Sequence, residues 1–142
     1  MIDASGDIVC SDAPPGERGW KIALAPLTES SDEASRYVWL ANAALTTSGD
    51  AYQFVELNGQ RYSHIVDPHT GLGLTERSSV TVIAPDCTTA DSLATAVSVL
   101  GVEKGLALIE ATPATAALIV RLAGKKVVVV TSSRFPKAAA IK

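Results

Sequence analysis

One stretch of this 142-residue chain follows the repeat of an amphipathic helix from end to end. Between residues 88 and 101, apolar side chains recur three or four positions apart, and Gly101 ends the pattern. The apolar stripe consists of Ala90, Leu93, Ala94, Val97 and Leu100. Because the segments before and after it have the short, alternating pattern of strands, the chain is predicted to have an α+β fold.

Short strands are expected on both sides of this helix. Asn58-Gly59 is the strongest turn signal, and it predicts a hairpin between its flanking segments. A second helix is expected over residues 103–110, and the strand over residues 20–25 is expected to pair with the first strand. The predicted strands cover residues 2–10 (interrupted at Ser5 and Gly6), 20–25, 37–45, 52–57, 60–66, 79–84, 115–122 and 126–131. The chain is thus predicted to be one domain over residues 1–142, a mixed, largely antiparallel sheet with two helices packed on one face.

The composition argues against several kinds of partner or site. The net charge is −3 and the basic residues are scattered, so no nucleic-acid partner is expected. No apolar run reaches the roughly 20 residues that a membrane span needs. Cys10 and Cys87 have no metal-binding spacing, and two free thiols are expected.

Asp91 and Thr95 are four residues apart, so they lie on one face of the predicted helix, and Ser98 continues that polar stripe. In one interpretation Thr88 is the N-cap and Asp91 completes a capping box with it. In the other, the carboxylate and hydroxyl oxygens are part of the ligand set of Mg²⁺, which is completed by water and phosphate. The residue pattern alone leaves both interpretations open.

Both histidines of the chain lie in one short segment, "RYSHIVDPHTGLG", where a strand meets a loop. A histidine near a strand end can simply be packed and hydrogen-bonded. His64, however, ends an unusually polar strand and precedes a loop whose glycines allow close approach to a ligand. Asp67, which precedes a proline, is either a turn former or a ligand contact.

Three segments, in order, resemble the C-terminal half of the FAD:protein FMN transferases, the ApbE-like flavin transferases. They are "TTSGD", "YSHIVDPHTG" and "VTVIAPDCTTADSLATAVSVLG", similar to the family's "TSGD", "SHIIDPRTG" and "VTVIAPDAMTADALATALFVLG". The similarity extends over about residues 5–110. Each segment alone is a weak signal, whereas their joint order is specific.

The resemblance implies an enzyme that uses FAD and Mg²⁺, transfers FMN to a Ser or Thr hydroxyl of a target protein, and releases AMP. It implies that Asp91 and Thr95 are metal ligands and that His64 is the base that takes the proton from the acceptor hydroxyl. Histidine suits such a role near neutral pH. The residues that it places around the flavin nucleotide are Ser5, Gly6, Asp7, Ser48, Gly49, Asp67, Thr70 and Gly71.

The chain also departs from the family pattern. His69 stands where the family usually has Arg, Ser5 where it has Gly, and Leu72-Gly73 where it often has Tyr-Pro. The resemblance covers only the family's C-terminal half, so the N-terminal half is expected to be missing and to act as a partner. On that basis the 142-residue chain alone is predicted to be inactive.

Two other functions compete with the transferase. One is a non-catalytic module that binds FAD without transferring FMN, which the altered loop at His69 favours. The other is a folding unit with no activity of its own. The family points to membrane redox subunits as acceptors and suggests a bacterial periplasmic or membrane-anchored lipoprotein setting.

Overall fold

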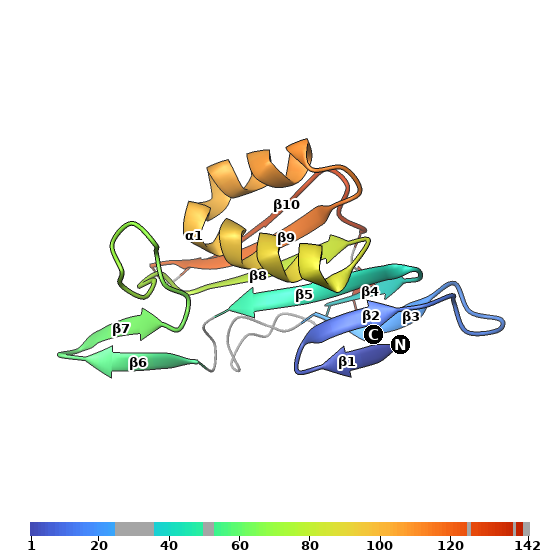
Figure 1. The fold of residues 1–142 in the computed structure, drawn as a ribbon, viewed down its shortest axis with the longest axis horizontal. Helices are drawn as coiled ribbons and strands as arrows, with labels where there is room; N and C mark the ends of the chain where they lie inside the picture. The colour runs from blue at the N-terminus through green and yellow to red at the C-terminus, as the bar shows by residue number, and fades with distance from the viewer. Residues whose placement is uncertain (25–35, 50–52, 125, 138, 141–142) are drawn as a thin grey trace.

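A computed structural model describes residues 1–24, 36–49, 53–124, 126–137 and 139–140 of the chain. It has three layers: the helix α1 (Cys87–Ala111), a six-stranded sheet and a three-stranded sheet. A separate two-stranded hairpin projects to one side (Figure 1). The α+β class is confirmed.

All described strand pairs are antiparallel. The six-stranded sheet has the order β1 (Ile2–Ala4), β2 (Asp7–Cys10), β5 (Ala43–Gly49), β8 (Ser78–Ala84), β9 (Ala116–Ala123) and β10 (Lys126–Thr131). The three-stranded sheet has the order β11 (Ala139–Ala140), β4 (Arg36–Leu40) and β3 (Trp20–Ala23). The hairpin consists of β6 (Phe54–Leu57) and β7 (Gln60–Ser63). The largely antiparallel sheet is confirmed, and none of the described pairs is parallel.

The six-stranded sheet separates two hydrophobic cores, as the alternation along β8 illustrates. Val80 and Val82 face α1 and pack with Ala94, whereas Ile83 faces the other way and packs with Val38 of the three-stranded sheet. Successive side chains of a strand point to opposite faces. Complete burial of a valine contributes roughly 1.5–3 kcal/mol, so both layers depend on the register of this strand.

α1 is one helical element with a break, and not the two separate helices predicted. Gly101 has φ 75° and ψ −177°, which is not helical, and this backbone conformation is essentially restricted to glycine. The chain turns there, and the second segment also lies over the sheet (Figure 1). By length and composition α1 could cross a membrane, but the break and the burial of Ala90, Ala94 and Ile109 against the sheet are those of a core helix.

The break at Ser5 and Gly6 is confirmed, but residues 2–10 form two antiparallel strands, β1 and β2, and not one interrupted strand. Three other strand predictions are wrong in part, and one of these is the strand over residues 60–66, which ends at Ser63 as β7. Residues 37–45 form two strands, β4 and β5, because Asn42 has φ 50° and interrupts the extended chain. β3 pairs with β4 in the second sheet and makes no ladder with β1 or β2. β11 lies after residues 126–131, the last strand that was predicted. Ala25 and Tyr52, at the ends of two predicted strands, lie outside the described residues.

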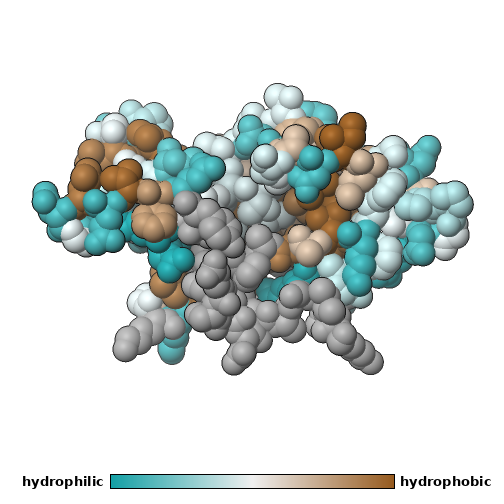
Figure 2. All heavy atoms as spheres, turned by 90° about the horizontal axis from the view of Figure 1, so that it is seen from below, coloured by the Kyte–Doolittle hydropathy of each residue, from teal (hydrophilic) through white to brown (hydrophobic). Residues whose placement is uncertain are grey.

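The β6–β7 hairpin is confirmed, with positive φ at both Asn58 and Gly59. It exposes Phe54, Val55 and Leu57 (45%, 49% and 59%), and Figure 2 shows hydrophobic residues beside hydrophilic ones at this end of the molecule. The Arg61 guanidinium lies 3.4 Å from the centroid of the Phe54 ring. A two-stranded hairpin alone is marginally stable, and an exposed apolar patch often marks an interaction surface.

Candidate functional site

Asp86 caps the N-terminus of α1. Its carboxylate accepts hydrogen bonds from the backbone N–H and the hydroxyl of Thr89, both at 2.8 Å. These bonds hold the pKa of the Asp86 carboxyl below its ordinary value. The helix therefore begins at Cys87, and the predicted N-cap at Thr88 is wrong.

Asp91 takes no part in this cap. The first turn of α1, all of which is described, contains no acidic residue. The capping box between Thr88 and Asp91 is therefore wrong as well, because a cap at Asp86 places Asp91 in the second turn. Asp91 is exposed to solvent, so its carboxylate is accessible to a ligand.

Thr95 lies one turn after Asp91 on the same face of α1, and it is also exposed. Its Oγ1 is 3.2 Å from the Oγ of Ser48 on β5. Ser48 itself is buried, at 9% exposed. Asp91 and Thr95 thus lie at the surface, with Thr95 in contact with the buried sheet.

The face of β5 that meets α1 carries hydroxyl groups. Thr46, two residues before Ser48, has its Oγ1 3.8 Å from the Sγ of Cys87. Asp7 on β2 is directly opposite Thr46 in the ladder, and directly opposed residues lie on the same face of a sheet. The predicted residues Asp7 and Ser48 therefore share the face on which α1 begins.

Ser5 and Gly6 form the tight turn between β1 and β2. Their φ values are 59° and 102°, as a two-residue hairpin turn with two positive φ angles requires. The Gly6 N–H donates to Oδ1 of Asp3 at 3.0 Å. This hydrogen bond and the turn conformation give Ser5 and Gly6 a structural role. Their contact with a nucleotide stays a prediction.

His64 follows β7 and its side chain is exposed. Its Nδ1 lies 3.1 Å from the backbone oxygen of Gln53, to which its backbone N–H also donates at 3.2 Å. A carbonyl oxygen can only accept, so Nδ1 is the donor in this contact, and in the neutral ring of that tautomer the lone pair lies on Nε2. The role of Gln53 has no signal in the sequence, because only its backbone oxygen makes these contacts.

The loop over residues 66–73 closes on itself through its own turns. Oδ1 of Asp67 accepts from the His69 N–H at 2.8 Å, and Oγ1 of Thr70 accepts from the Leu72 N–H at 3.3 Å. The Gly71 N–H donates to the backbone carbonyl oxygen of Asp67 at 2.8 Å. Asp67 is thus a turn former, one of the two roles considered for it.

Asp67 and Thr70 also line a shallow pocket of about 310 Å³ together with Tyr62, Leu74 and Thr75. No hydrogen bond between described residues joins this loop to Asp91 or Thr95. The predicted site residues lie on two sets of elements: α1, β5 and the β1–β2 hairpin on the one hand, and His64 with the 66–73 loop on the other.

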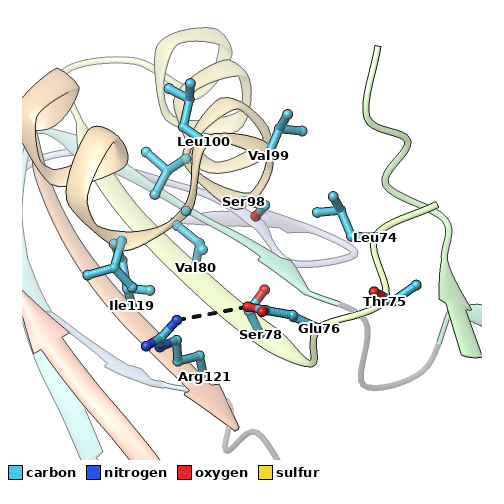
Figure 3. Close-up of a pocket in the computed structure, with 13 residues that line it drawn as sticks. Leu74, Thr75, Glu76, Ser78, Val80, Ser98, Val99, Leu100, Ile119 and Arg121 are labelled. Carbon is cyan, nitrogen blue, oxygen red and sulfur yellow. Dashed lines mark ion pairs between the residues drawn. The ribbon is translucent and has the colours of Figure 1, made fainter. Parts of the chain in front are cut away.

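A second pocket, of about 220 Å³, lies between the end of the first α1 segment and the sheet (Figure 3). Its walls include Val80, Val97, Leu100 and Ile119. At its rim an Arg121 nitrogen lies 3.9 Å from a Glu76 oxygen. The sequence did not predict this ion pair. Glu76 lies in the loop before β8 and Arg121 in β9, and two isolated charges so far apart in the sequence form no recognisable motif.

Ser98 lines this second pocket. Its hydroxyl donates to the Ala94 oxygen at 2.9 Å, so it lies beside the helix backbone. The continuation of the Asp91 and Thr95 stripe through Ser98 therefore leads into the pocket.

The donor set at α1 fits a hard cation that brings its own further ligands. Asp91 and Thr95 supply oxygen atoms only, and no group of three or more His, Cys, Asp or Glu among the described residues could hold a metal. Structural zinc needs such a group. Mg²⁺ binds through one or two carboxylates and completes its shell with water and phosphate, so the two residues fit magnesium and a phosphorylated ligand.

The chain belongs to the ApbE family, whose model matches residues 1–119. Among its relatives, an FAD:protein FMN transferase of Vibrio cholerae is 35% identical over 122 residues, covering 85% of this chain and 36% of the relative. A protein of the same name from Haemophilus influenzae is 33% identical, with the same coverage.

Solved structures agree with this family. Flavin transferase ApbE of Vibrio cholerae aligns with a TM-score of 0.78 and 32% identity, over 94% of this chain and 42% of that one. The apo form of the flavinyl transferase ApbE of Pseudomonas stutzeri gives 0.73 and 35%, over 92% and 40%. The chain therefore spans well under half the length of the relatives that it matches.

Proposed function

We propose that this chain is the metal- and base-bearing part of an FAD:protein FMN transferase. In this reaction FMN passes from FAD to a Ser or Thr hydroxyl of a target protein, and AMP is released. The observation that carries the proposal is the pair Asp91 and Thr95, exposed one turn apart and free of the helix cap that Asp86 forms. Family membership supports the class of reaction.

Asp91 and Thr95 would hold Mg²⁺ through a carboxylate and a hydroxyl oxygen. When bound, the ion neutralises charge on the pyrophosphate of FAD, which is the main requirement for phosphoryl transfer. The two side chains fix the position of that charge on the rigid first segment of α1. Both residues are accessible from solvent, as an ion arriving with a nucleotide requires.

His64 would act as the base. Its Nε2 takes the proton from the acceptor hydroxyl while that oxygen attacks the phosphorus on the FMN side of the pyrophosphate. The bond from this phosphorus to the bridging oxygen breaks, and AMP leaves with the bonding electrons. The contact of Nδ1 with the Gln53 oxygen supports this role because it orients the ring, and Nε2 carries the lone pair of the neutral tautomer that donates from Nδ1.

The remaining predicted residues would border the nucleotide. Asp7 shares the face of the sheet on which α1 begins, and Ser5 and Gly6 form the adjoining turn. Gly49 ends β5, where a Cβ would lie 3.2 Å from the Ser78 oxygen. Asp67, Thr70 and Gly71 would form the opposite border, and Asp67 and Thr70 line the shallow pocket beside it.

The partner of this part would be the polypeptide that makes up the rest of the relatives' length. The hydrophobic patch of Phe54, Val55 and Leu57 supports such a partner, since it gives the β6–β7 hairpin an apolar surface to be covered. Without that partner one wall of the cleft is absent and water competes for the phosphates. We therefore expect the 142-residue chain alone to be inactive.

A module that binds FAD without transferring FMN is the second candidate. It is favoured by the 66–73 loop, where Asp67 Oδ1 and Thr70 Oγ1 already accept backbone N–H groups and His69 stands in place of the family's Arg. Such a loop has fewer free polar atoms with which to align the nucleotide. The two candidates differ in whether AMP is released.

A chimera tests the proposal: the matched 36% of the Vibrio cholerae relative is replaced by this chain. We expect it to release AMP from FAD when Mg²⁺ and that relative's protein acceptor are present. Asp91→Ala in the chimera should reduce the apparent affinity for Mg²⁺ by at least about tenfold. FAD binding without AMP release would reject the transferase in favour of the binding module.

A further inference from the structure

The hydroxyl of Thr95 differs from those of two serines inside α1 and of the threonine that follows its last residue. Ser92, Ser98 and Thr112 each donate to the carbonyl oxygen four residues earlier, at 2.7, 2.9 and 2.8 Å. This is the usual behaviour of Ser and Thr inside helices. Thr95 instead has its Oγ1 3.2 Å from Ser48 Oγ on β5, so its side chain is oriented by the sheet.

Ser48 is a firm reference point for this orientation. It lies near the end of β5, two residues beyond the last pair of the β2–β5 ladder, and is only 9% exposed. Its backbone is fixed by the ladder with β8, where it is opposite Val80. A short, buried side chain on a strand has few accessible conformations. The contact with Ser48 therefore fixes the position of the Thr95 hydroxyl oxygen.

We infer that Ser48 is a positioning residue for Thr95, which it orients so that the Thr95 oxygen faces the cation beside Asp91. This inference rests on the proposed function. Each hydroxyl has one proton and two lone pairs. When Thr95 donates its proton to Ser48, both lone pairs of Thr95 stay open to a cation, and a cation in turn makes the Thr95 hydroxyl a better donor. Ser48 thus acts through Thr95, in addition to the nucleotide contact predicted for it.

The chain contains a matched control for this hydroxyl pair. Thr47, the next residue of β5, lies on the opposite face, and its Oγ1 is 2.9 Å from Oγ1 of Thr81. Thr47→Ala therefore removes a hydroxyl contact of the same kind from the same strand, away from α1. Ser48→Thr keeps the hydroxyl and serves as the conservative variant.

The first measurement needs neither metal nor activity. Three-bond scalar couplings of Thr95, measured by NMR on the 142-residue chain, report its χ1 angle. We expect one rotamer in the wild type, in Thr47→Ala and in Ser48→Thr, and averaging over rotamers in Ser48→Ala. Ser48→Cys keeps the volume but supplies only a weak acceptor, so it should behave like Ser48→Ala and replaces it if the alanine variant is unfolded.

The second measurement is a titration with Mn²⁺, which broadens nearby amide signals and competes with Mg²⁺, made on the chimera in the presence of FAD so that the whole proposed ligand set is available. We expect broadening centred on Asp91 and Thr95 in the wild type. Ser48→Ala should require about tenfold more Mn²⁺ for the same effect, as is typical when a partner of a metal ligand is removed. The Mn²⁺ concentration that Thr47→Ala requires should stay within about twofold of the wild-type value, which is a small difference in binding free energy.

The outcomes separate this inference from the proposed function. If Mn²⁺ broadens the Asp91 and Thr95 signals, but Ser48→Ala retains both the Thr95 rotamer and the Mn²⁺ response, the positioning role is wrong and the metal site stands. If the wild type shows no broadening centred on these residues, the proposed metal site fails and the inference fails with it. Loss of affinity in Thr47→Ala equal to that in Ser48→Ala would also overturn it.

Discussion

Gly105 lies against Val97 across the break in α1: a Cβ on Gly105 would fall 2.7 Å from Cγ1 of Val97. Real side chains essentially never approach so closely. The absence of a side chain at residue 105 therefore allows the second segment of α1 to pack onto the first. Val97, 1% exposed, then fills the space between α1 and the sheet.

Gly105→Ala should lower the free energy of unfolding by about 1–3 kcal/mol, the usual cost of overpacking a core. The sign is informative, because Ala in place of an uncrowded helical Gly stabilises by about 1 kcal/mol. Urea denaturation followed by circular dichroism measures the change. In a Val97→Ala background the same substitution should cost less, and an equal cost in both backgrounds would refute the steric explanation.

Glu110→Gln should make thermal stability less dependent on pH in the acid range. Glu110 accepts from the Ser133 N–H and hydroxyl at 2.6 and 2.7 Å, and Arg134 lies 3.2 Å away. These partners, the Ser133 N–H above all, hold the pKa of Glu110 below its ordinary value near 4.5. A lowered pKa contributes stability that is fully present above the unfolded-state pKa and is lost as pH falls through the folded-state pKa.

The melting temperature, measured from about pH 7 to about pH 2.5, should therefore be lower in Glu110→Gln than in the wild type at neutral pH. The two curves should converge at the acid end. Glu103→Gln changes an exposed glutamate on the same helix and is the control. A difference between wild type and Glu110→Gln that stays constant across the whole range would contradict the assignment.

Gly73→Ala should disturb the loop that carries Asp67 and Thr70. A Cβ at Gly73 would collide with the backbone oxygen of Ser63 and lie 3.1 Å from the Tyr62 Cβ. Strand β7 would have to move, at a cost of about 1–3 kcal/mol. Amide chemical shifts over residues 60–75 should change together.

Gly71→Ala provides the comparison within the same loop. Gly71 has φ +69° but no atom within 4 Å of its would-be Cβ, so only backbone strain of roughly 1 kcal/mol is added. Its amide shifts should change locally. Equal and extensive changes in both variants would show that close packing at Gly73 is unimportant.

His64→Ala, placed in the chimera, should slow FMN transfer by about 10²–10⁴-fold, the typical contribution of a general base. FAD affinity, followed by flavin fluorescence, should change less than about twofold, a small free-energy difference. His69 is the other histidine of the chain, and His69→Ala is the matched control, expected to leave the transfer rate near that of the unsubstituted chimera. Equal losses in the two variants would remove His64 from the role of base.

Local signals in the sequence predicted local structure well. The Asn58-Gly59 turn and the strands after the helix are present, and the apolar stripe of α1 is buried or partly buried except at Leu100, which is 43% exposed. The helix start was misplaced by two residues because Asp86 and Thr88 are both good caps, and Asp86 is selected by its two bonds to Thr89.

Interactions between distant residues were not predictable in the same way. β3 alternates as a strand should, but its pairing with β4 depends on a second sheet that no local pattern indicates. The 3.2 Å contact of Ser48 and Thr95 joins residues 47 positions apart. For the candidate site, the order of the three family-like segments in the sequence was enough to identify the family. The orientation of each side chain could be seen only in the folded structure.

The six-stranded sheet contributes side chains to the hydrophobic cores on both of its faces. It therefore couples the three-stranded sheet to α1, although each packs on a different face. A cavity opened at Val38, on the side of the three-stranded sheet, would be relieved by movement of β8, and β8 also supports the residues beneath α1. A substitution that opens this cavity beneath the three-stranded sheet would thus change the orientation of the Thr95 side chain on the other face. Natural variation in the two layers is expected to be correlated for this reason.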